Sequence, residues 1–336
     1  MIFASDLDRT LIYSKKSMAL PNDQSVKYRL VETLDGKEIS YMSEEAISLL
    51  SDLNKELTFI PVTTRTIEQF KRIKIFQNEI CPTFAVTTNG ASILEDGKLD
   101  EEWQTKIIKD VTDNCLTSYD FLNEFQQIAN DEWVLSNKMA DNIFSYCILD
   151  EAKIPEKELH TFGEWGKSQG WTVSRQGRKL YFIPHPVNKG AALQYLKEKL
   201  NHPYTFAAGD SYLDYSLLLQ AHRSFIPQHG QLMSQLIEES HIKPTIQKGI
   251  LASEEMLQNV LDYYFGSTLN LNDSNLLSAV EACKMWSIDS STLRKRVKDF
   301  PEGTIRKFGN SYVVTKQGME TVFGVPESNQ KTSLST

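Results

Sequence analysis

Short apolar runs alternate with amphipathic segments at the start of this 336-residue chain, and this order restricts the fold more than any other feature. Apolar runs predict strands at Met1–Ser5, Leu57–Val62 and Thr83–Thr87. Apolar residues at helical spacing predict one helix that begins after Ser43 and a second over Ile67–Gln77. Strands and helices in this order form a parallel sheet with helices on its faces. We therefore predict an α/β fold.

A stretch of different character interrupts the alternation after residue 91. It holds helix-like segments and apolar runs that predict strands at Ile143–Leu149, Trp171–Ser174 and Leu180–Ile183, which indicates a mixed α+β insertion. A predicted helix over Gly190–Leu200 and a predicted strand over Tyr204–Ala208 then resume the first pattern. The predicted parts are a core of residues 1–91 and 185–265, an insertion of 92–184, a polar linker of 266–275, a module of 276–324 and a disordered tail of 325–336.

Charge, cysteine content and hydropathy exclude several classes of protein. The net charge of −8 argues against a protein that coats nucleic acid along its whole surface, although residues 276–336 carry nine Lys or Arg against six Asp or Glu. The four cysteines lie far apart without a C-x-x-C pair, which indicates reduced thiols rather than a disulfide framework or a zinc site. No apolar run approaches the ~20 residues of a membrane helix, and the N-terminus has no leader pattern. We expect a cytoplasmic protein without a membrane partner.

Carboxylates gather where the first strand is expected to end. Asp6 and Asp8 are two residues apart, so their side chains point to the same side of an extended chain. Two carboxylates this close repel each other unless a cation lies between them, and Mg²⁺ is the cation that best suits such oxygen ligands. Asp210 and Asp214 follow a later predicted strand, and the ends of parallel strands lie on one edge of a sheet. A lone Asp-x-Asp is more often a solvated turn, so the predicted magnesium site depends on these further residues.

Two further groups complete an ordered set of motifs. Thr63, Thr64 and Arg65 follow the second predicted strand, and a Lys-Gly pair begins at Lys189, where the helix after the insertion starts. The order Asp-x-Asp-x-Thr, strand-end Thr, Lys-Gly and Gly-Asp-x-x-x-Asp resembles the four motifs of the haloacid dehalogenase superfamily of phosphotransferases, over roughly residues 1–265. The resemblance implies a Rossmann-like parallel sheet core with an inserted cap.

The same resemblance implies a role for each motif residue. Asp6 would be the nucleophile that becomes a transient aspartyl phosphate. Asp8 would act first as general acid and then as general base. Thr63 and Lys189 would hold the phosphoryl oxygens. The implied Mg²⁺ site consists of Asp6, the backbone carbonyl of Asp8, Asp210 and Asp214, the last as a ligand or as an orienting group.

The place of the insertion, after Asn89-Gly90-Ala91 and before Lys189, resembles the class IIB cap of Cof-type and sucrose-phosphatase-like members of the superfamily. Such a cap closes over the substrate, excludes water and supplies most of the specificity. The implied substrate-binding residues are Thr64, Arg65, Asn89, Gly90, Arg178 and Lys179. The last two are candidates for holding a second anionic group, and exposed charged residues in a turn are an equally good interpretation of them.

Two residues depart from the pattern of the superfamily. Arg9 stands where Cof-type members have glycine, which predicts a stiffer loop and a more cationic pocket. Leu213 stands where an asparagine usually precedes the final aspartate, which leaves the role of Asp214 open. The run Asp-Leu-Asp-Arg-Thr-Leu-Ile-Tyr-Ser, together with Val-Thr-Thr-Arg-Thr, is also similar to superfamily members from bacterial tellurite- and stress-resistance gene clusters.

The C-terminal module has its own pattern. Ser278 and Glu281 have capping-box spacing at the start of a predicted helix, Ser290–Val297 predicts a second and basic helix, and Gly309-Asn310 predicts the turn of a two-stranded wing. This order resembles the compact winged helix-turn-helix modules of small bacterial and phage DNA-binding proteins. The implied DNA contacts are Ser290, Ser291, Arg294 and Lys295 in the major groove and Arg306 or Lys307 on the backbone. The alternative is a dimerisation or docking module for a protein partner, and operator binding would itself need a homodimer.

Two hypotheses about function result. The first is Mg²⁺-dependent hydrolysis of a small phosphomonoester, either a sugar phosphate or a nucleotide-like phosphate. The second is a regulator that binds a phosphorylated ligand and passes its state to a DNA-binding module. Every group needed for turnover is present, including Asp8, which a mere sensor can lose. A phosphomutase is a weaker third option, because it must keep water away from the aspartyl phosphate.

Overall fold

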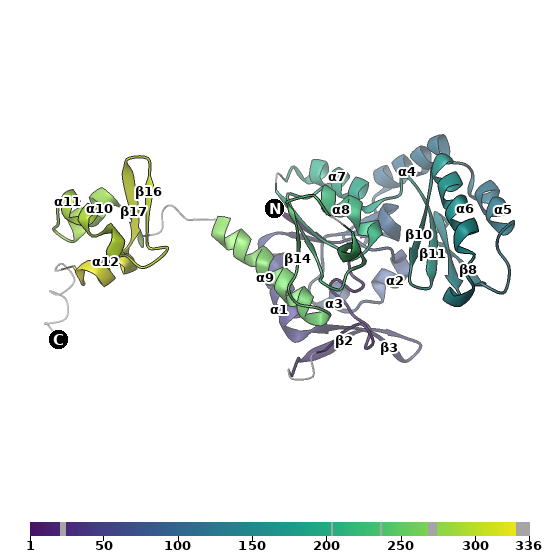
Figure 1. The fold of residues 1–336 in the computed structure, drawn as a ribbon, viewed down its shortest axis with the longest axis horizontal. Coiled ribbons are helices and arrows are strands. Elements are labelled where there is room, and N and C mark those ends of the chain that lie inside the picture. The colour runs from purple at the N-terminus through teal and green to yellow at the C-terminus, as the bar shows by residue number, and fades with distance from the viewer. Residues whose placement is uncertain (21–24, 203, 236, 268–273, 327–336) are drawn as a thin grey trace. The chain divides into compact units, whose positions relative to one another are not determined.

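The computed structural model describes residues 1–20, 25–202, 204–235, 237–267 and 274–326 (Figure 1). The chain forms two compact units, Met1–Tyr263 and Tyr264–Thr336. Residues 268–273 of the predicted linker and 327–336 of the predicted tail lie outside the described residues. In the described part of the chain, no helix is both long enough and apolar enough to cross a membrane.

A parallel five-stranded sheet forms the centre of the first unit, as the alternation predicted. Its strand order is β14-β13-β12-β1-β4. The strands are β1 (Ile2–Ser5), β4 (Thr58–Pro61), β12 (Thr205–Ala208), β13 (Arg223–Ile226) and β14 (Ile242–Pro244). A parallel bridge between Val62 and Val86 connects this sheet to an antiparallel ladder of β5 (Phe84–Thr87), β6 (Ser92–Glu95) and β7 (Lys98–Leu99). The carboxyl ends of the parallel strands share one edge, where the candidate site lies.

Helices cover both faces of this sheet because the strands are apolar on both sides. Ile2 and Ala4 pack in one buried cluster with Leu193 of α7 and Leu217 of α8, two helices that lie side by side in Figure 1. The Phe3 side chain, which alternates with Ile2 and Ala4, lies with its ring 5.9 Å from that of Phe59. The helices around the core are α1 (Glu44–Glu56), α2 (Ile67–Lys71), α3 (Ile75–Asn78), α4 (Glu101–Asn114), α7 (Lys189–Leu200), α8 (Tyr215–Leu219) and α9 (Ile250–Ser267).

The predicted helix over Ile67–Gln77 is broken into α2 and α3. The break lies where the backbone pairs with the antiparallel hairpin of β2 (Tyr28–Leu34) and β3 (Lys37–Ser43). The Lys74 amide donates to the Val31 carbonyl at 2.9 Å, and Ile73 forms a bridge with Glu32. These backbone groups therefore hydrogen-bond to strand β2 instead of continuing the helix.

The insertion carries a four-stranded antiparallel sheet of order β10-β11-β9-β8. Its strands are β8 (Val134–Ala140), β9 (Phe144–Leu149), β10 (Trp171–Gln176) and β11 (Lys179–Pro184), and its helices are α5 (Ser118–Gln126) and α6 (Glu156–Ser168). Phe121 of α5, Phe162 of α6 and Phe182 of β11 share a second buried cluster. Strand β8 has no counterpart among the predicted strands, because it is a mostly exposed edge strand in which Ser136, Asn137 and Lys138 interrupt the apolar residues.

The second unit contains the predicted helix-turn-helix order within a small core. Its elements are β15 (Leu276–Ser278), α10 (Ala279–Met285), α11 (Ser290–Lys295), β16 (Ile305–Phe308), β17 (Ser311–Thr315) and α12 (Lys316–Phe323). The predicted capping box is confirmed, since the Glu281 amide donates to Ser278 Oγ and the Ser278 amide donates to Glu281 Oε2. The predicted two-stranded wing is part of a three-stranded sheet, because β15 pairs with β17.

Candidate active site

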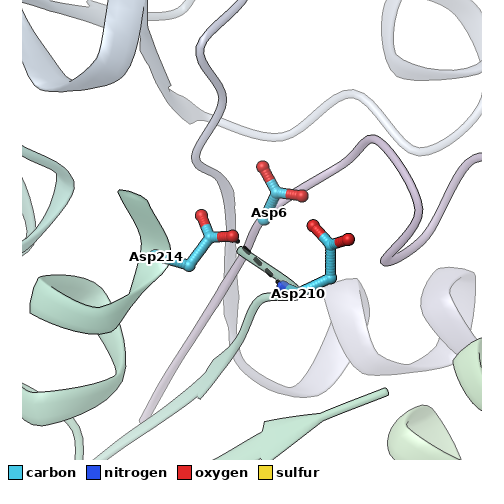
Figure 2. Close-up of side chains that lie close together, drawn as sticks. All are labelled: Asp6, Asp210 and Asp214. Atoms are coloured by element: carbon cyan, nitrogen blue, oxygen red, sulfur yellow. Dashed lines mark hydrogen bonds between the residues drawn. The ribbon is translucent and has the colours of Figure 1, made fainter. Parts of the chain in front are cut away.

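Three buried carboxylates meet at the carboxyl edge of the parallel sheet. Asp6 follows β1, whereas Asp210 and Asp214 belong to the turn after β12. One carboxylate oxygen of each lies within 4.8 Å of the others (Figure 2). None of the three side chains is more than a tenth exposed. This set of hard oxygen donors fits a divalent cation such as Mg²⁺.

Lys189 supplies the ammonium inside this acidic cluster. Its Nζ lies 2.6 Å from Asp6 Oδ1 and 2.5 Å from Asp214 Oδ1, and its side chain is 1% exposed. The residue begins α7, and the preceding Asn188 caps that helix by accepting a hydrogen bond from the Ala191 amide at 2.8 Å. Burial acts to lower the pKa of Lys189, but the charges of Asp214 and Asp6 outweigh it and leave that pKa raised. The helix therefore delivers a permanent positive charge to the sheet edge.

The carboxylates hold more negative charge than one ammonium can balance. Burial, together with the charge of Asp214, raises the pKa of Asp6 well above its usual value. Burial and Asp214 also raise the pKa of Asp210 to about 7. Raised values of this kind are expected where like charges crowd together without a compensating cation. A bound divalent cation would favour the ionised form of all three groups.

Asp214 holds its neighbours in the site in place through both of its carboxylate oxygens. Its Oδ2 accepts hydrogen bonds from the Asp210 amide at 3.1 Å, the Ser211 amide at 2.9 Å and Ser211 Oγ at 2.7 Å. Its Oδ1 faces Lys189. Leu213 is buried in the apolar core cluster, so the leucine at this position serves packing. Asp214 thus fixes both the turn that carries Asp210 and the ammonium of Lys189.

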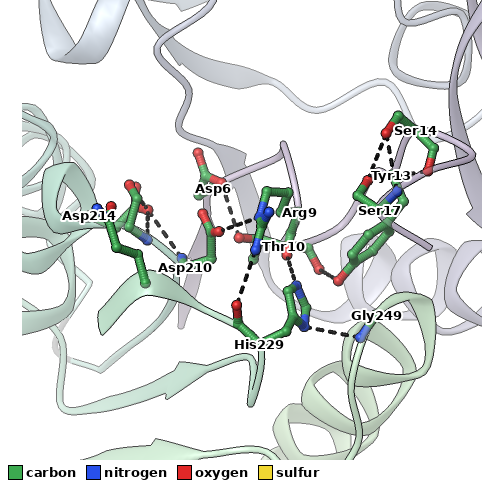
Figure 3. A network of polar contacts seen from close by, with 12 residues as sticks. Asp6, Arg9, Thr10, Tyr13, Ser14, Ser17, Asp210, Asp214, His229 and Gly249 are labelled. Carbon is green, nitrogen blue, oxygen red and sulfur yellow. Dashed lines mark hydrogen bonds and ion pairs between the residues drawn. The ribbon is translucent and has the colours of Figure 1, made fainter. Parts of the chain in front are cut away.

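Arg9 makes the pocket more cationic, as its departure from the usual glycine predicted. Its backbone has a φ of 65°, the left-handed region that glycine adopts most readily. Its Nε lies 3.0 Å from Asp210 Oδ2, and Nη2 donates to the His229 carbonyl at 3.1 Å (Figure 3). The His229 ring in turn bonds the Arg9 carbonyl through Nε2 and accepts from the Gly249 amide at Nδ1, at the start of α9. Arg9 therefore connects Asp210 of the cluster to His229, which in turn contacts the start of α9.

The carboxylate of Asp8 lies outside the cluster and pairs with Arg65. Arg65 Nε and Nη2 donate to the two Asp8 oxygens at 2.7 and 2.8 Å. Desolvation acts to raise the pKa of Asp8, but the charge and hydrogen bonds of Arg65 outweigh it and leave that pKa lowered. Asp8 is therefore ionised in this arrangement, on the side of the site that faces the insertion.

Arg65 is held on its other side by a glutamate that no sequence motif indicates. Glu32 of β2 has a side chain that is 0% exposed, and its Oε2 lies 2.8 Å from Arg65 Nη1. Arg72 Nε also lies 3.3 Å from Glu32 Oε1, and Ser40 Oγ donates to Oε2 at 2.8 Å. A glutamate within a hairpin carries no local signal for this pairing, because its partners come from distant parts of the chain.

Thr10, the last residue of the Asp-x-Asp-x-Thr motif, contacts the Asp6 carboxylate. Its Oγ1 donates to Asp6 Oδ2 at 3.0 Å. Together with Lys189 on the other oxygen, this bond fixes the orientation of the Asp6 carboxylate.

The remaining predicted residues of the core lie around the cluster with different partners. Thr63 is fully buried, and its Oγ1 accepts from the Arg65 amide at 3.2 Å. Thr64 is close enough to Tyr181 of β11 to lower the pKa of that phenol, against the larger effect of burial. Asn89 Nδ2 donates to the Val187 carbonyl at 3.1 Å, just before the segment that carries Lys189.

Gly90 and Arg178 have contacts that position the backbone. Gly90 has a φ of 100°, and a Cβ at this position would lie 2.4 Å from the Asn188 carbonyl oxygen. This close approach fits the 3₁₀ turn Thr88–Gly90 against the start of α7. Arg178 Nε donates to the Leu149 carbonyl at 3.2 Å within the insertion.

The predicted DNA contacts all lie on exposed surface of the second unit. Ser290, Ser291, Arg294 and Lys295 are exposed on α11, and Arg306 and Lys307 are exposed on β16. Asp289 caps α11 by accepting from the Thr292 amide at 2.8 Å and also accepts from Ser291 Oγ at 2.7 Å. Ser291 is thereby partly engaged by the cap.

Comparisons with known proteins agree with both units. Residues 1–262 match the family model described as sucrose-6F-phosphate phosphohydrolase. Residues 270–328 match a family model described as a helix-turn-helix domain. No curated protein matches the chain.

Solved structures resemble the first unit at low sequence identity. The sucrose-phosphatase from Synechocystis sp. PCC6803, in complex with sucrose and phosphate, is 16% identical with a TM-score of 0.55, over 79% of this chain and 98% of that chain. A protein from Thermoplasma acidophilum is 14% identical with a TM-score of 0.49, over 79% and 97% of the two chains. A haloacid dehalogenase-like hydrolase from Bacillus subtilis is 17% identical with a TM-score of 0.47, over 79% and 92%. The likeness to the first of these concerns the fold.

Proposed function

We propose that the chain hydrolyses a small phosphomonoester with Mg²⁺ through an aspartyl phosphate, because it belongs to the sucrose-6F-phosphate phosphohydrolase family over residues 1–262 and is a phosphatase of the haloacid dehalogenase type. One observation carries the proposal. The Asp6 carboxylate is buried at the end of β1, held by Lys189, and adjacent to Asp210 and Asp214. A nucleophilic carboxylate needs this setting, because an anionic phosphate approaches it only where cations balance the charge.

In the first step an oxygen of Asp6 attacks phosphorus and the bond to the leaving oxygen breaks. Asp8 donates its proton to that leaving oxygen. In the second step Asp8 accepts a proton from water, the water oxygen attacks phosphorus, and the bond to Asp6 breaks. Phosphate leaves and Asp6 is restored.

Arg65 and Asp8 must separate for the first of these steps. The lowered pKa of Asp8 suits its role as a base in the second step but opposes its role as an acid in the first. An anionic substrate supplies a second acceptor for the Arg65 guanidinium, so substrate entry weakens the bond between Arg65 and Asp8. Weakening of this bond raises the pKa of Asp8, so protonation of Asp8 is favoured only when substrate is present.

The phosphoryl oxygens would be held from two sides. Lys189 provides a buried ammonium, and Thr63, at the end of β4 next to β1, provides a hydroxyl. Asp6, Asp210 and the backbone carbonyl of Asp8 would ligate Mg²⁺, with Asp214 holding the turn. When bound, Mg²⁺ neutralises the phosphoryl charge and brings the group to the carboxylate edge.

The family match favours one class of substrate. A sugar phosphate is favoured over a nucleotide-like phosphate because the matched family is described by a sugar-phosphate substrate. The test is phosphate release from a panel of phosphomonoesters with Mg²⁺ and with EDTA. We expect release by the wild type only with Mg²⁺, loss of at least about a thousandfold in Asp6→Asn, and full release by Asp113→Asn, an exposed aspartate of α4. Release by Asp6→Asn at the wild-type rate would remove the proposal.

A second function is favoured by the helix-turn-helix match. We propose that the second unit binds DNA, with α11 entering the major groove and β16 on the backbone. The full chain is expected to retard duplex DNA with an affinity that falls as salt rises, and Arg294→Ala is expected to reduce the slope of log affinity against log salt by about 1. Lys167→Ala, in the first unit, is the matched control and is expected to leave the slope unchanged. Absence of salt-dependent binding would instead favour a docking or dimerisation module.

A further inference from the structure

We propose that the leaving group of the substrate carries a second anionic group, and that Lys179 and Lys138 of the insertion bind it. This inference rests on the proposed phosphatase function and adds the chemical class of the substrate. The group is a carboxylate or a second phosphate, as in a phosphorylated sugar acid or a sugar bisphosphate. An uncharged disaccharide phosphate would lack it.

The register of the inserted sheet places both lysines on one face. Lys138 of β8 pairs with Tyr146 of β9, and Tyr146 pairs with Tyr181 of β11. Lys179 lies two residues before Tyr181 and therefore points to the same face. Its Nζ lies 5.7 Å from the centre of the Tyr146 ring.

This face of the sheet is turned toward the core. Tyr181 and Phe144 belong to it and pack in the same apolar cluster as residues of the parallel sheet. The other face, with Leu180 and Phe182, packs against α5 and α6 in the second cluster. Both lysines are thus presented to the space above the catalytic edge rather than to the outer surface of the insertion.

A hydrogen-bonded clasp holds the edge of this sheet on the core. Asp141, in the turn between β8 and β9, accepts a hydrogen bond from the Ile67 amide at 3.1 Å and another from Thr88 Oγ1. Lys138 lies three residues before the clasp, on the strand that the clasp secures. The insertion therefore stands over the site in the arrangement that the structure shows.

Neither lysine has a carboxylate partner among the described residues, where no carboxylate oxygen lies within 4.0 Å of either ammonium. The nearby carboxylates of Asp8 and Glu32 are paired with arginines. Desolvation lowers the pKa of Lys179, and the charges of Arg65 and Lys138 lower it further against the opposing effect of Asp8. Two neighbouring cations that repel each other without a counterion are suited to an anionic ligand.

The position of Asp8 identifies which part of the substrate lies there. Asp8 is the group that gives a proton to the leaving oxygen, so the atoms attached to that oxygen extend from Asp8 into the space beneath the insertion. Lys179 is close enough to Asp8 for each charge to affect the pKa of the other. The second anion therefore belongs to the leaving group and not to the phosphoryl group, which Lys189 and the metal site receive.

The test compares sugar phosphates with and without a second anionic group. Phosphate release is measured with Mg²⁺ from glucose 6-phosphate, from 6-phosphogluconate and from fructose 1,6-bisphosphate, so that the last two separate a carboxylate from a second phosphate. We expect kcat/KM to be at least about tenfold higher for one of the two anionic substrates than for glucose 6-phosphate. Lys179→Ala is expected to reduce this preference by about 10- to 100-fold, mainly through KM, and Lys138→Ala by a smaller factor. Lys179→Arg is expected to retain most of the preference.

Lys157→Ala, an exposed lysine of α6, is the control for a general change in charge of the insertion and is expected to behave as the wild type. Preference of the wild type for glucose 6-phosphate, or an equal loss for charged and uncharged substrates in Lys179→Ala, would overturn the inference and leave the phosphatase function standing. No phosphate release from any substrate in the presence of Mg²⁺ would overturn the proposed function, and this inference with it.

Discussion

Replacement of Lys189 by methionine tests the electrostatics of the site most severely. The ammonium has two contacts, 2.6 Å to Asp6 and 2.5 Å to Asp214, and all three side chains are less than a tenth exposed. Lys189→Met keeps the length and apolar volume of the side chain but removes the ammonium from Asp6 and Asp214, while Arg9 stays paired with Asp210. Removal of one partner from a buried ion pair costs about 3–5 kcal/mol. We expect a loss of this size in the free energy of unfolding at pH 8 in EDTA.

The loss is expected to shrink as the pH falls. The pKa of Asp6 is raised by burial and by Asp214, and the pKa of Asp210 is raised to about 7. Without the ammonium these values rise further, so the carboxylates take up protons and the repulsion among them disappears. Lys189 itself contributes no pH dependence between pH 5 and 8, because its raised pKa keeps it charged throughout. At pH 5 we expect a loss of about 1–2 kcal/mol, the cost of ordinary hydrogen bonds.

Urea denaturation followed by far-ultraviolet circular dichroism measures both values. Lys199→Met is the matched control, since Lys199 also belongs to α7 and also contacts two carboxylates, Glu95 at 2.7 Å and Asp100 at 2.9 Å, but its side chain is 34% exposed. An exposed pair of this kind contributes about 1 kcal/mol or less. Added Mg²⁺ is expected to restore stability to Lys189→Met but not phosphate release. A loss no larger than that of Lys199→Met at pH 8, or the same loss at pH 5 and pH 8, would show that Lys189 does not balance the charge of the buried carboxylates.

Three further outcomes are expected. Mg²⁺ is expected to raise the thermal midpoint of the wild type more at pH 8 than at pH 6, because Asp210, with a pKa of about 7, must lose its proton before it binds a cation; an equal rise at both values would contradict this. Glu32→Gln is expected to lower the free energy of unfolding by about 3 kcal/mol, measured in urea, because the buried guanidinium of Arg65 then faces a neutral amide; a change below about 0.5 kcal/mol would match an ordinary surface site instead. Asp141→Ala is expected to raise KM by about three- to tenfold in steady-state assays, because the hydrogen bonds that hold the insertion on the core are lost; an unchanged KM would show that the clasp does not affect substrate binding.

Local patterns predicted the elements that place the site. The apolar run before Asp6 is β1, and the lysine that begins the helix after the insertion is at the start of α7. These predictions succeeded because a buried parallel strand is apolar along its length and a helix start has its own capping residues. Because β1 and β12 are parallel neighbours, the residues after them meet, and Asp6, Asp210 and Asp214 lie within 4.8 Å of one another.

Pairings between distant segments could not be predicted in the same way. Nothing near Glu32 indicates that Arg65 will bind it, since the two meet only when the hairpin folds onto the sheet edge. The break between α2 and α3 also depends on that hairpin, which supplies the Val31 carbonyl. Strand β8 has three consecutive polar residues at its centre and takes its place in the sheet by pairing with β9. Each of these features is decided by tertiary contacts that override local preference.

The proposed function requires that the Asp6 carboxylate accepts a phosphoryl group in the presence of a divalent cation. Beryllium trifluoride, which has the shape and charge of a phosphoryl group and binds carboxylate oxygens, tests this without knowledge of the substrate. We expect a bound ¹⁹F signal in the wild-type protein that requires Mg²⁺ and is absent from Asp6→Asn. A signal of equal strength in Asp6→Asn, or none in the wild type with Mg²⁺, would contradict it.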